Sequence, residues 1–170
     1  MKILLSLTSV LLLTIFSLQG QEIVHIEDRF DRKPIVKMKL NGKNIWVLLD
    51  TGSSINLLDL ASMKKYKFKT YEQASDARNV IGLGSDEMQL LEVGNIDLVY
   101  KGVTLKGKFL TYDISNLITS FHAESGIAIS GIIGSELMGK YGFVIDMKSN
   151  KAILSYKRKK GSAGSASQPY

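Results

Sequence analysis

Cysteine is absent from this 170-residue sequence. The chain can therefore form no disulfide bond and can hold no metal ion through thiolates. It also has no cysteine after its N-terminal apolar run that could carry a lipid. Histidine is scarce: His25 and His122 lie far apart and lack the His-Glu-x-x-His spacing of metallopeptidases. We interpret both as ordinary surface or loop residues, and we expect neither a metal ion nor a cofactor.

Acidic residues are outnumbered, 16 against 22 lysines and arginines, for a formal net charge of +6. Much of the excess comes from the run KRKK at residues 157–160. Such a run can bind nucleic acid or an anionic surface. No aromatic or arginine-rich recognition pattern accompanies it, so we interpret it as solvated and expect no nucleic-acid partner. Residues 161–170 resemble a linker or tag, and we assign 157–170 to a flexible tail.

One long apolar run is present, at residues 3–18, directly after Lys2. Leu18 and Gly20 offer a −3/−1 pair for cleavage before Gln21, so we interpret residues 1–20 as a signal peptide. The alternative is an uncleaved N-terminal membrane anchor, for which about 16 apolar-rich residues are slightly short. We therefore expect an exported protein, periplasmic or secreted, with no stable membrane partner once the signal is cleaved.

The rest of the chain is typical of a single mainly β domain over residues 34–156, preceded by an N-terminal strand or arm at 21–33. Residues 35–40 alternate apolar and charged side chains, as in a half-buried strand. Asn41-Gly42 favours a hairpin turn, and the apolar run 45–49 favours a strand buried on both faces.

The rest of the domain is predicted to consist of short segments separated by turns. We expect turns at Lys101-Gly102 and Ser149-Asn150, a short helix at 135–140, and a short helix or irregular segment at 55–66. Residues 115–126, SNLITSFHAESG, are polar and irregular. Many short strands with few helices predict a closed, barrel-like β fold.

Asp50 stands at the end of the apolar strand and is followed by Thr-Gly-Ser-Ser. The pattern predicts that this carboxylate is buried, which is costly unless it is paired or hydrogen-bonded. A structural turn aspartate is the simpler interpretation, because threonine and glycine suit a bend. Some eighty residues later a second apolar strand ends in glycine, in GIIG at 131–134, and precedes the short helix.

Together these features resemble the retropepsin-like aspartic proteases over roughly residues 34–156. The parts stand in the family's order: an LNGK hairpin, the Asp-Thr-Gly strand, a glycine-containing hairpin at 80–90 in the flap position, the Ile-Ile-Gly element and a closing hairpin. The resemblance implies an aspartic endopeptidase with a barrel-like β fold and a peptide or protein substrate.

The resemblance also implies roles for individual residues. Asp50 would be catalytic, with the Gly52 N–H close to the carboxylate. Thr51 would turn its hydroxyl toward the loop of a second subunit, and Ser53 would hydrogen-bond a carboxylate. The remaining residues with implied roles are Ile81, Gly82, Leu83 and Gly84 in a flap over the substrate, and Ile132, Ile133 and Gly134 in a distal structural loop.

The family mechanism needs two aspartates that share a proton, but the sequence holds one Asp-Thr-Gly. Five of the other aspartates stand in surface-loop, solvent-facing or hairpin-turn contexts: Asp59, Asp86, Asp97, Asp113 and Asp146. The resemblance therefore implies that Asp50 of a second copy completes the site in a homodimer. The alternative is a module with this fold that binds peptides without cleaving them.

Overall fold

The structure is a computed structural model that describes residues 21–71 and 90–159. The predicted signal peptide, the residues 161–170 and most of the predicted flap hairpin lie outside these ranges. In chain order the elements are β1 (Gln21–Arg29), β2 (Ile35–Leu40), β3 (Lys43–Asp50), β4 (Leu57–Asp59), the 3₁₀ helix η1 (Leu60–Ser62), α2 (Met63–Tyr66), β5 (Thr70–Tyr71), β6 (Leu91–Val93), β7 (Leu98–Tyr100), β8 (Val103–Thr104), β9 (Leu110–Tyr112), α3 (Ser115–Ser125), β10 (Gly131–Gly134), α4 (Ser135–Lys140), β11 (Phe143–Asp146) and β12 (Lys151–Lys159).

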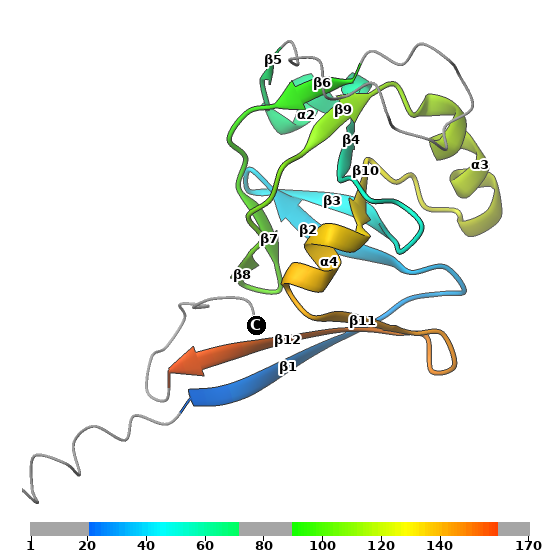
Figure 1. Cartoon of the computed structure of the whole chain (residues 1–170). Coiled ribbons are helices and arrows are strands. Elements are labelled where there is room, and N and C mark those ends of the chain that lie inside the picture. The colour runs from blue at the N-terminus through cyan, green and yellow to red at the C-terminus, as the bar shows by residue number, and fades with distance from the viewer. Residues whose placement is uncertain (1–20, 72–89, 160–170) are drawn as a thin grey trace, which may run out of the picture.

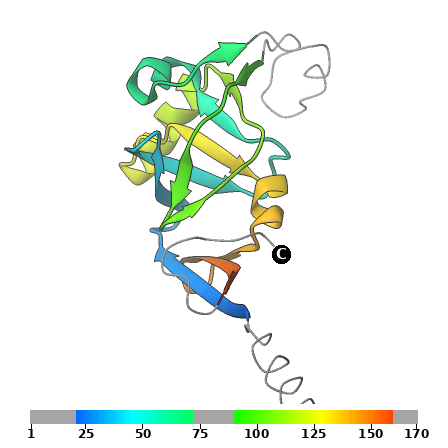
Figure 2. The same cartoon turned by 90° about the vertical axis from the view of Figure 1, so that its left-hand side faces the viewer.

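The strands form two sheets. The larger has nine strands in the order β5-β6-β9-β4-β10-β3-β2-β7-β8, and the smaller has three in the order β1-β12-β11. The larger sheet curls around itself, and the smaller one lies beneath it with α4 between them (Figures 1 and 2). This confirms the mainly β prediction. In the described part of the chain the two end strands of the larger sheet, β5 and β8, do not pair with each other, so the barrel-like sheet is a curled half-barrel.

The β2–β3 hairpin confirms the pattern of residues 35–49. The alternating residues of β2 point to the core or to solvent in turn. Asn41 and Gly42 both have positive φ, 49° and 80°, as a type I′ hairpin turn requires. β3 then lies between β2 and β10 in the middle of the large sheet.

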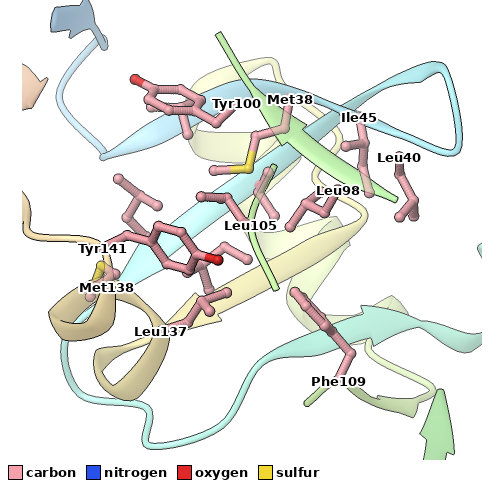
Figure 3. Packing of buried hydrophobic residues seen from close by; sticks show 14 of the residues in the cluster. Met38, Leu40, Ile45, Leu98, Tyr100, Leu105, Phe109, Leu137, Met138 and Tyr141 are labelled. Carbon is pink, nitrogen blue, oxygen red and sulfur yellow. The ribbon is translucent and has the colours of Figure 1, made fainter. Parts of the chain in front are cut away.

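Two apolar clusters cover the opposite faces of these central strands. The alternation of β3 divides its side chains, with Val47 and Leu49 in the larger cluster and Leu48 in the smaller one. β10 is divided in the same way, with Ile133 in the larger cluster and Ile132 in the smaller. Figure 3 shows part of the larger cluster, where side chains from β2, β3 and β7 meet those of α4. The strand that carries Asp50 is thus held by packing on both faces.

The prediction that residues 115–126 are irregular is wrong, because α3 spans Ser115–Ser125. Leu117, Ile118 and Phe121 share one side of this helix and pack against the smaller cluster. The Ser115 N–H donates to Asp113 Oδ1 at 2.9 Å where the helix begins. Its polar residues are those of a surface helix with one narrow apolar side.

Two further boundaries differ from expectation. The segment predicted as helical or irregular at 55–66 opens with the strand β4 and only then forms η1 and α2. The basic run does not start a tail, since β12 continues to Lys159 and pairs with β1 along its whole length. The strand expected within 21–33 is β1. Among the described residues no helix has the length and apolar character needed to cross a membrane.

Two buried tyrosines provide a stability test. The Tyr100 hydroxyl has no hydrogen-bond partner among the described residues, whereas the Tyr141 hydroxyl accepts the Lys106 N–H at 2.6 Å. We expect Tyr100→Phe to leave the free energy of unfolding unchanged or raise it, because it removes an unpaired buried group. We expect Tyr141→Phe to lower it by about 0.5–1.5 kcal/mol. Urea unfolding of both variants measures this, and a larger loss for Tyr100→Phe would contradict it.

Candidate functional site

Asp50 is the last residue of β3 and stands opposite Gly134 of the parallel strand β10. Its side chain is half-buried, so the prediction of full burial is wrong. The buried part of the strand ends one residue earlier, at Leu49. The chain then turns through Thr51 and Gly52, which are both exposed. The carboxylate therefore lies at the boundary between the core and the protein surface.

The turn after Asp50 holds its carboxylate. The Gly52 N–H donates to Asp50 Oδ1 at 2.9 Å. A Cβ at position 52 would lie 3.2 Å from the same oxygen, tighter than most real Cβ contacts. The Ser53 N–H donates to the Asp50 main-chain oxygen at 3.3 Å. Glycine at position 52 therefore lets the backbone approach and orient the carboxylate.

Ser53 has a different partner from the one the resemblance implies. Its hydroxyl donates to Ile55 O at 2.9 Å and accepts the Ile55 N–H at 3.3 Å. The prediction that Ser53 hydrogen-bonds a carboxylate is therefore wrong within one chain. The hydroxyl instead bonds to the main chain of Ile55, in the same loop. The Thr51 side chain is exposed, and its contact with a second subunit stays a prediction.

The loop at residues 51–56 wraps around the end of β10. This strand runs parallel to β3 on one side and antiparallel to β4 on the other, so it lies between the two strands that the loop connects (Figure 1). Where β10 passes into α4, the Ser135 N–H and hydroxyl both donate to Ser53 O, at 2.7 and 2.9 Å. The two segments predicted from the sequence as one constellation are thus in direct contact.

Gly134 is the closest point of this contact. A Cβ at this position would lie 2.4 Å from Ile55 O and 2.8 Å from Ser53 O, where real Cβ atoms are essentially never found. Both obstacles are backbone atoms, so no side-chain movement can relieve them. Ile132 and Ile133 are buried on opposite sides of β10 and hold the strand in the sheet.

Asn56 is a further residue of this site that the sequence reasoning missed. It is buried, with 5 % of its surface exposed. Its Oδ1 accepts the Gly134 N–H at 3.0 Å, and its Nδ2 donates to Lys108 O at 2.8 Å. One amide thus joins the loop, β10 and the segment before β9. In the sequence, the feature that could have indicated this role is the position of Asn56, a single amide residue between Ile55 and the apolar residues that begin β4.

The predicted flap residues Ile81, Gly82, Leu83 and Gly84 lie outside the described residues, as does Asp86. Asp97 and Asp113 are exposed, as expected. Asp146 is a turn residue, since its Oδ1 accepts the N–H groups of Lys148 and Ser149. In the described ranges no three histidines, aspartates or glutamates gather closely enough to hold a metal ion.

The prediction that Asp59 lies at the surface is wrong. It lies in β4 with 6 % of its surface exposed, and its Oδ1 has no hydrogen-bond partner among the described residues. Burial raises the pKa of this carboxyl, although backbone hydrogen bonds from Ala61 and Ile114 act in the opposite direction. Asp113 nearby raises the pKa further. No Thr-Gly follows Asp59, so it lacks the turn that holds the Asp50 carboxylate.

No protein-family model matches the sequence, and no curated protein is significantly similar to it. Solved structures do resemble its backbone. A retropepsin-like aspartic protease from Rickettsia conorii matches with a TM-score of 0.49 and 18 % identity, over 81 % of this chain and 95 % of that one.

Two other matches are the EIAV protease in complex with an inhibitor and the retroviral protease-like domain of Ddi1 from Leishmania major. The first has a TM-score of 0.47 and 20 % identity, over 65 % of this chain and 88 % of that one. The second has a TM-score of 0.46 and 13 % identity, over 77 % and 98 %. All three are named as proteases or as a protease-like domain. The likeness concerns the general course of the backbone and carries no conclusion about catalysis.

The contact at Gly134 gives a matched pair of variants. Gly134→Ala places a methyl group against two backbone carbonyls, so we expect a loss of unfolding free energy of about 1–3 kcal/mol or more. Gly139 lies within α4, and a Cβ there would meet nothing within 4 Å. We expect Gly139→Ala to be neutral or to stabilise by up to about 1 kcal/mol. Thermal and urea unfolding compare the two, and equal effects would contradict the close contact.

Asp59 gives a pH-dependent test. A carboxyl whose pKa is raised on folding stabilises the fold when protonated, and this contribution is lost as the pH rises above about 4. We therefore expect Asp59→Asn to gain stability relative to the parent protein between pH 4 and pH 7. Melting temperatures at both pH values measure the difference, with the exposed Asp97→Asn as the control for losing one negative charge. If the difference in melting temperature between Asp59→Asn and the parent protein is the same at both pH values, the prediction is contradicted.

Proposed function

We propose that the protein is an aspartic endopeptidase that hydrolyses peptide bonds with a water molecule activated by Asp50. The observation that supports this most is the Asp50 turn itself. Its carboxylate is half-buried at the end of a central strand, and one oxygen accepts the Gly52 N–H at 2.9 Å. The loop behind it is fixed by two hydrogen bonds from Ser135 to Ser53 O. A structural turn aspartate needs no such bracing from a distant segment of the chain.

The proposed reaction uses two facing carboxylates that share one proton, because two like charges so close together do not both ionise. The ionised carboxylate takes a proton from water as the water oxygen bonds to the peptide carbonyl carbon. The protonated carboxyl gives its proton to the carbonyl oxygen. The intermediate then returns a hydroxyl proton to the pair, the amide nitrogen takes the other proton, and the C–N bond breaks. The products are a carboxylic acid and an amine.

The second carboxylate is proposed to be Asp50 of the partner subunit. Three of the other aspartates were described above in different settings: Asp59 buried in β4, Asp97 exposed and Asp146 in a hairpin turn. Thr51 and Gly52 are exposed at the tip of the turn, where the loop of a second copy can reach them. A two-fold axis beside this tip brings two identical loops together. In this proposal the monomer is inactive.

A peptide-cleavage assay with a matched pair of aspartate variants tests the catalytic role. We expect Asp50→Asn to lower the rate of cleavage of a diverse peptide library by a factor of about 10²–10⁴ or more, because it removes the acid–base group. Asp97→Asn makes the same chemical change at an exposed site and should leave the rate unchanged. Mass spectrometry at acid and neutral pH detects the products. Cleavage that survives in Asp50→Asn would overturn the assignment.

Subunit mixing tests the shared site. Excess Asp50→Asn protein should inhibit the parent enzyme, since mixed dimers hold only one intact carboxylate. Excess Asp97→Asn protein should not. Specific activity should also fall when the enzyme is diluted below its dimer dissociation constant. Undiminished activity in both experiments would show a complete site in one chain. If no condition yields cleavage but parent and Asp50→Asn bind peptides equally, the chain is a peptide-binding module instead.

A further inference from the structure

The Asp50 side chain points to one face of the larger sheet, and the strand register identifies that face. Because side chains alternate along a strand, Asp50 lies on the same side as Leu48, which belongs to the smaller cluster. Strand pairing continues this row across the sheet through three further residues of the smaller cluster: Ile132, Leu57 and Leu110. All of them are buried. The face that carries the Asp50 carboxylate is therefore apolar and covered as far as β9.

Beyond β9 the same row becomes polar and exposed. Glu92 of β6 stands opposite Leu110, and Tyr71 of β5 stands opposite Glu92. The Tyr71 side chain is 57 % exposed. Lys108 lies two residues before Leu110 and points to the same side, since its Nζ pairs with Glu92 Oε2 at 3.6 Å. At the β5–β6 end of the sheet (Figure 1), the Asp50 face thus presents an aromatic ring beside a charged pair.

Gly94 allows the aromatic ring to lie against the strand. A Cβ at position 94 would lie 2.7 Å from Tyr71 Cε2, so the ring occupies the space that a side chain would fill. The Gly94 N–H donates to Lys69 O at 2.9 Å, which continues the β5–β6 ladder by one residue pair. Lys69 is exposed and stands two residues before Tyr71, hence on the same side. We call these four residues the distal cluster: Lys69, Tyr71, Glu92 and Lys108.

Asn56 connects the distal cluster to the loop of Asp50. Its Nδ2 donates to Lys108 O at 2.8 Å, and its Oδ1 accepts the N–H of Gly134, which stands opposite Asp50. Three strand spacings separate β3 from β9 in the sheet order, or about 14 Å. An extended peptide advances about 3.3 Å per residue. A peptide that crosses the strands from Asp50 toward β5 therefore meets the cluster about four residues from the bond that is cleaved.

The distal cluster is net basic. Its two lysines stand against one glutamate, for a formal charge of +1. The Glu92–Lys108 pair leaves both side chains accessible, since they are 44 % and 59 % exposed. Asp59 points to the same face from β4, but it is buried and out of reach of a bound peptide. Charges of opposite sign across an interface favour the matching partner and exclude others. The cluster therefore suits an acidic side chain better than a basic one.

We propose that the distal cluster gives the enzyme a preference for peptides with aspartate or glutamate about four residues from the cleaved bond. This inference rests on the proposed endopeptidase function and adds its substrate class. The acidic side chain lies against the Tyr71 ring, and its carboxylate pairs with Lys108 and Lys69. Glu92 opposes this binding because it competes for Lys108. Since an exposed ion pair contributes little, the expected preference for glutamate over glutamine is about two- to fivefold in kcat/KM.

Cleavage of peptide pairs tests this preference. The two peptides of a pair differ only by glutamate or glutamine at one position, which is moved along the sequence on both sides of the cleaved bond. Lys108→Gln should lower the glutamate-to-glutamine ratio of kcat/KM toward one, and it keeps the bond to Asn56, which uses a main-chain oxygen. Glu92→Gln should raise the ratio, because it removes the competitor. Lys148→Gln makes the same change in the β11–β12 turn, far from β5 and β6 (Figure 1), and should leave the ratio unchanged.

Salt separates an electrostatic preference from a change in the fold. At about 1 M salt the Debye length is about 3 Å, so the ratio of the parent enzyme should also fall toward one. A parent enzyme that cleaves, with equal ratios in Lys108→Gln and Lys148→Gln, overturns this inference and leaves the proposed function standing. So does a preference for lysine over glutamate at this distance.

A binding measurement decides the inference if the parent protein cleaves no peptide and the proposed function fails. Fluorescence anisotropy then compares the same peptide pairs, labelled with a dye, on the full chain. Tighter binding of the glutamate peptide that is lost in Lys108→Gln supports the distal cluster as the selecting group. Equal affinity of the parent protein for both peptides overturns it.

Discussion

The passage of β10 between β3 and β4 is the constraint on which the rest of the site depends. At Gly134 the two backbones approach so closely that any side chain would meet the carbonyl oxygen of Ile55 at 2.4 Å. Neither backbone can move away, because β10 is hydrogen-bonded to β3 on one side and to β4 on the other. The loop that carries Asp50 and the start of α4 are therefore positioned as one unit.

Packing on both faces of the sheet extends this constraint through the domain. Leu49 and Ile133 lie in the larger cluster, whereas Leu48 and Ile132 lie in the smaller one beneath α3. A shift of β3 or β10 by one residue would exchange these two sets between the clusters, so the register is strongly specified. The buried Asn56 adds polar links to Gly134 and Lys108 that only this register satisfies. The position of the Asp50 carboxylate thus follows from the packing of the whole core.

Much of this arrangement was predictable from local sequence patterns. The alternation in β2, the Asn41-Gly42 turn and the apolar run of β3 each specify their own structure over a few residues. The Ile-Ile-Gly element and its helix were placed correctly at 131–140 for the same reason. The failures concern residues whose surroundings come from distant segments. α3 was missed because its narrow apolar side can be recognised only from its packing against the smaller cluster. Asp59 was misplaced because its strand, β4, lies inside the sheet between β9 and β10, which the local sequence does not indicate.

By itself, the sequence determined the strand that leads to Asp50 and the glycine turn after it. Both depend on side-chain periodicity and turn chemistry over a few residues, which need no tertiary information. Only the tertiary structure decided that Asp50 is half-buried, that Ser53 bonds to Ile55 and that Asn56 joins three segments. It likewise decided that the basic run at 157–159 is strand beside β1 rather than tail. The physical reason is that burial and hydrogen-bond partners depend on contacts between residues far apart in the chain.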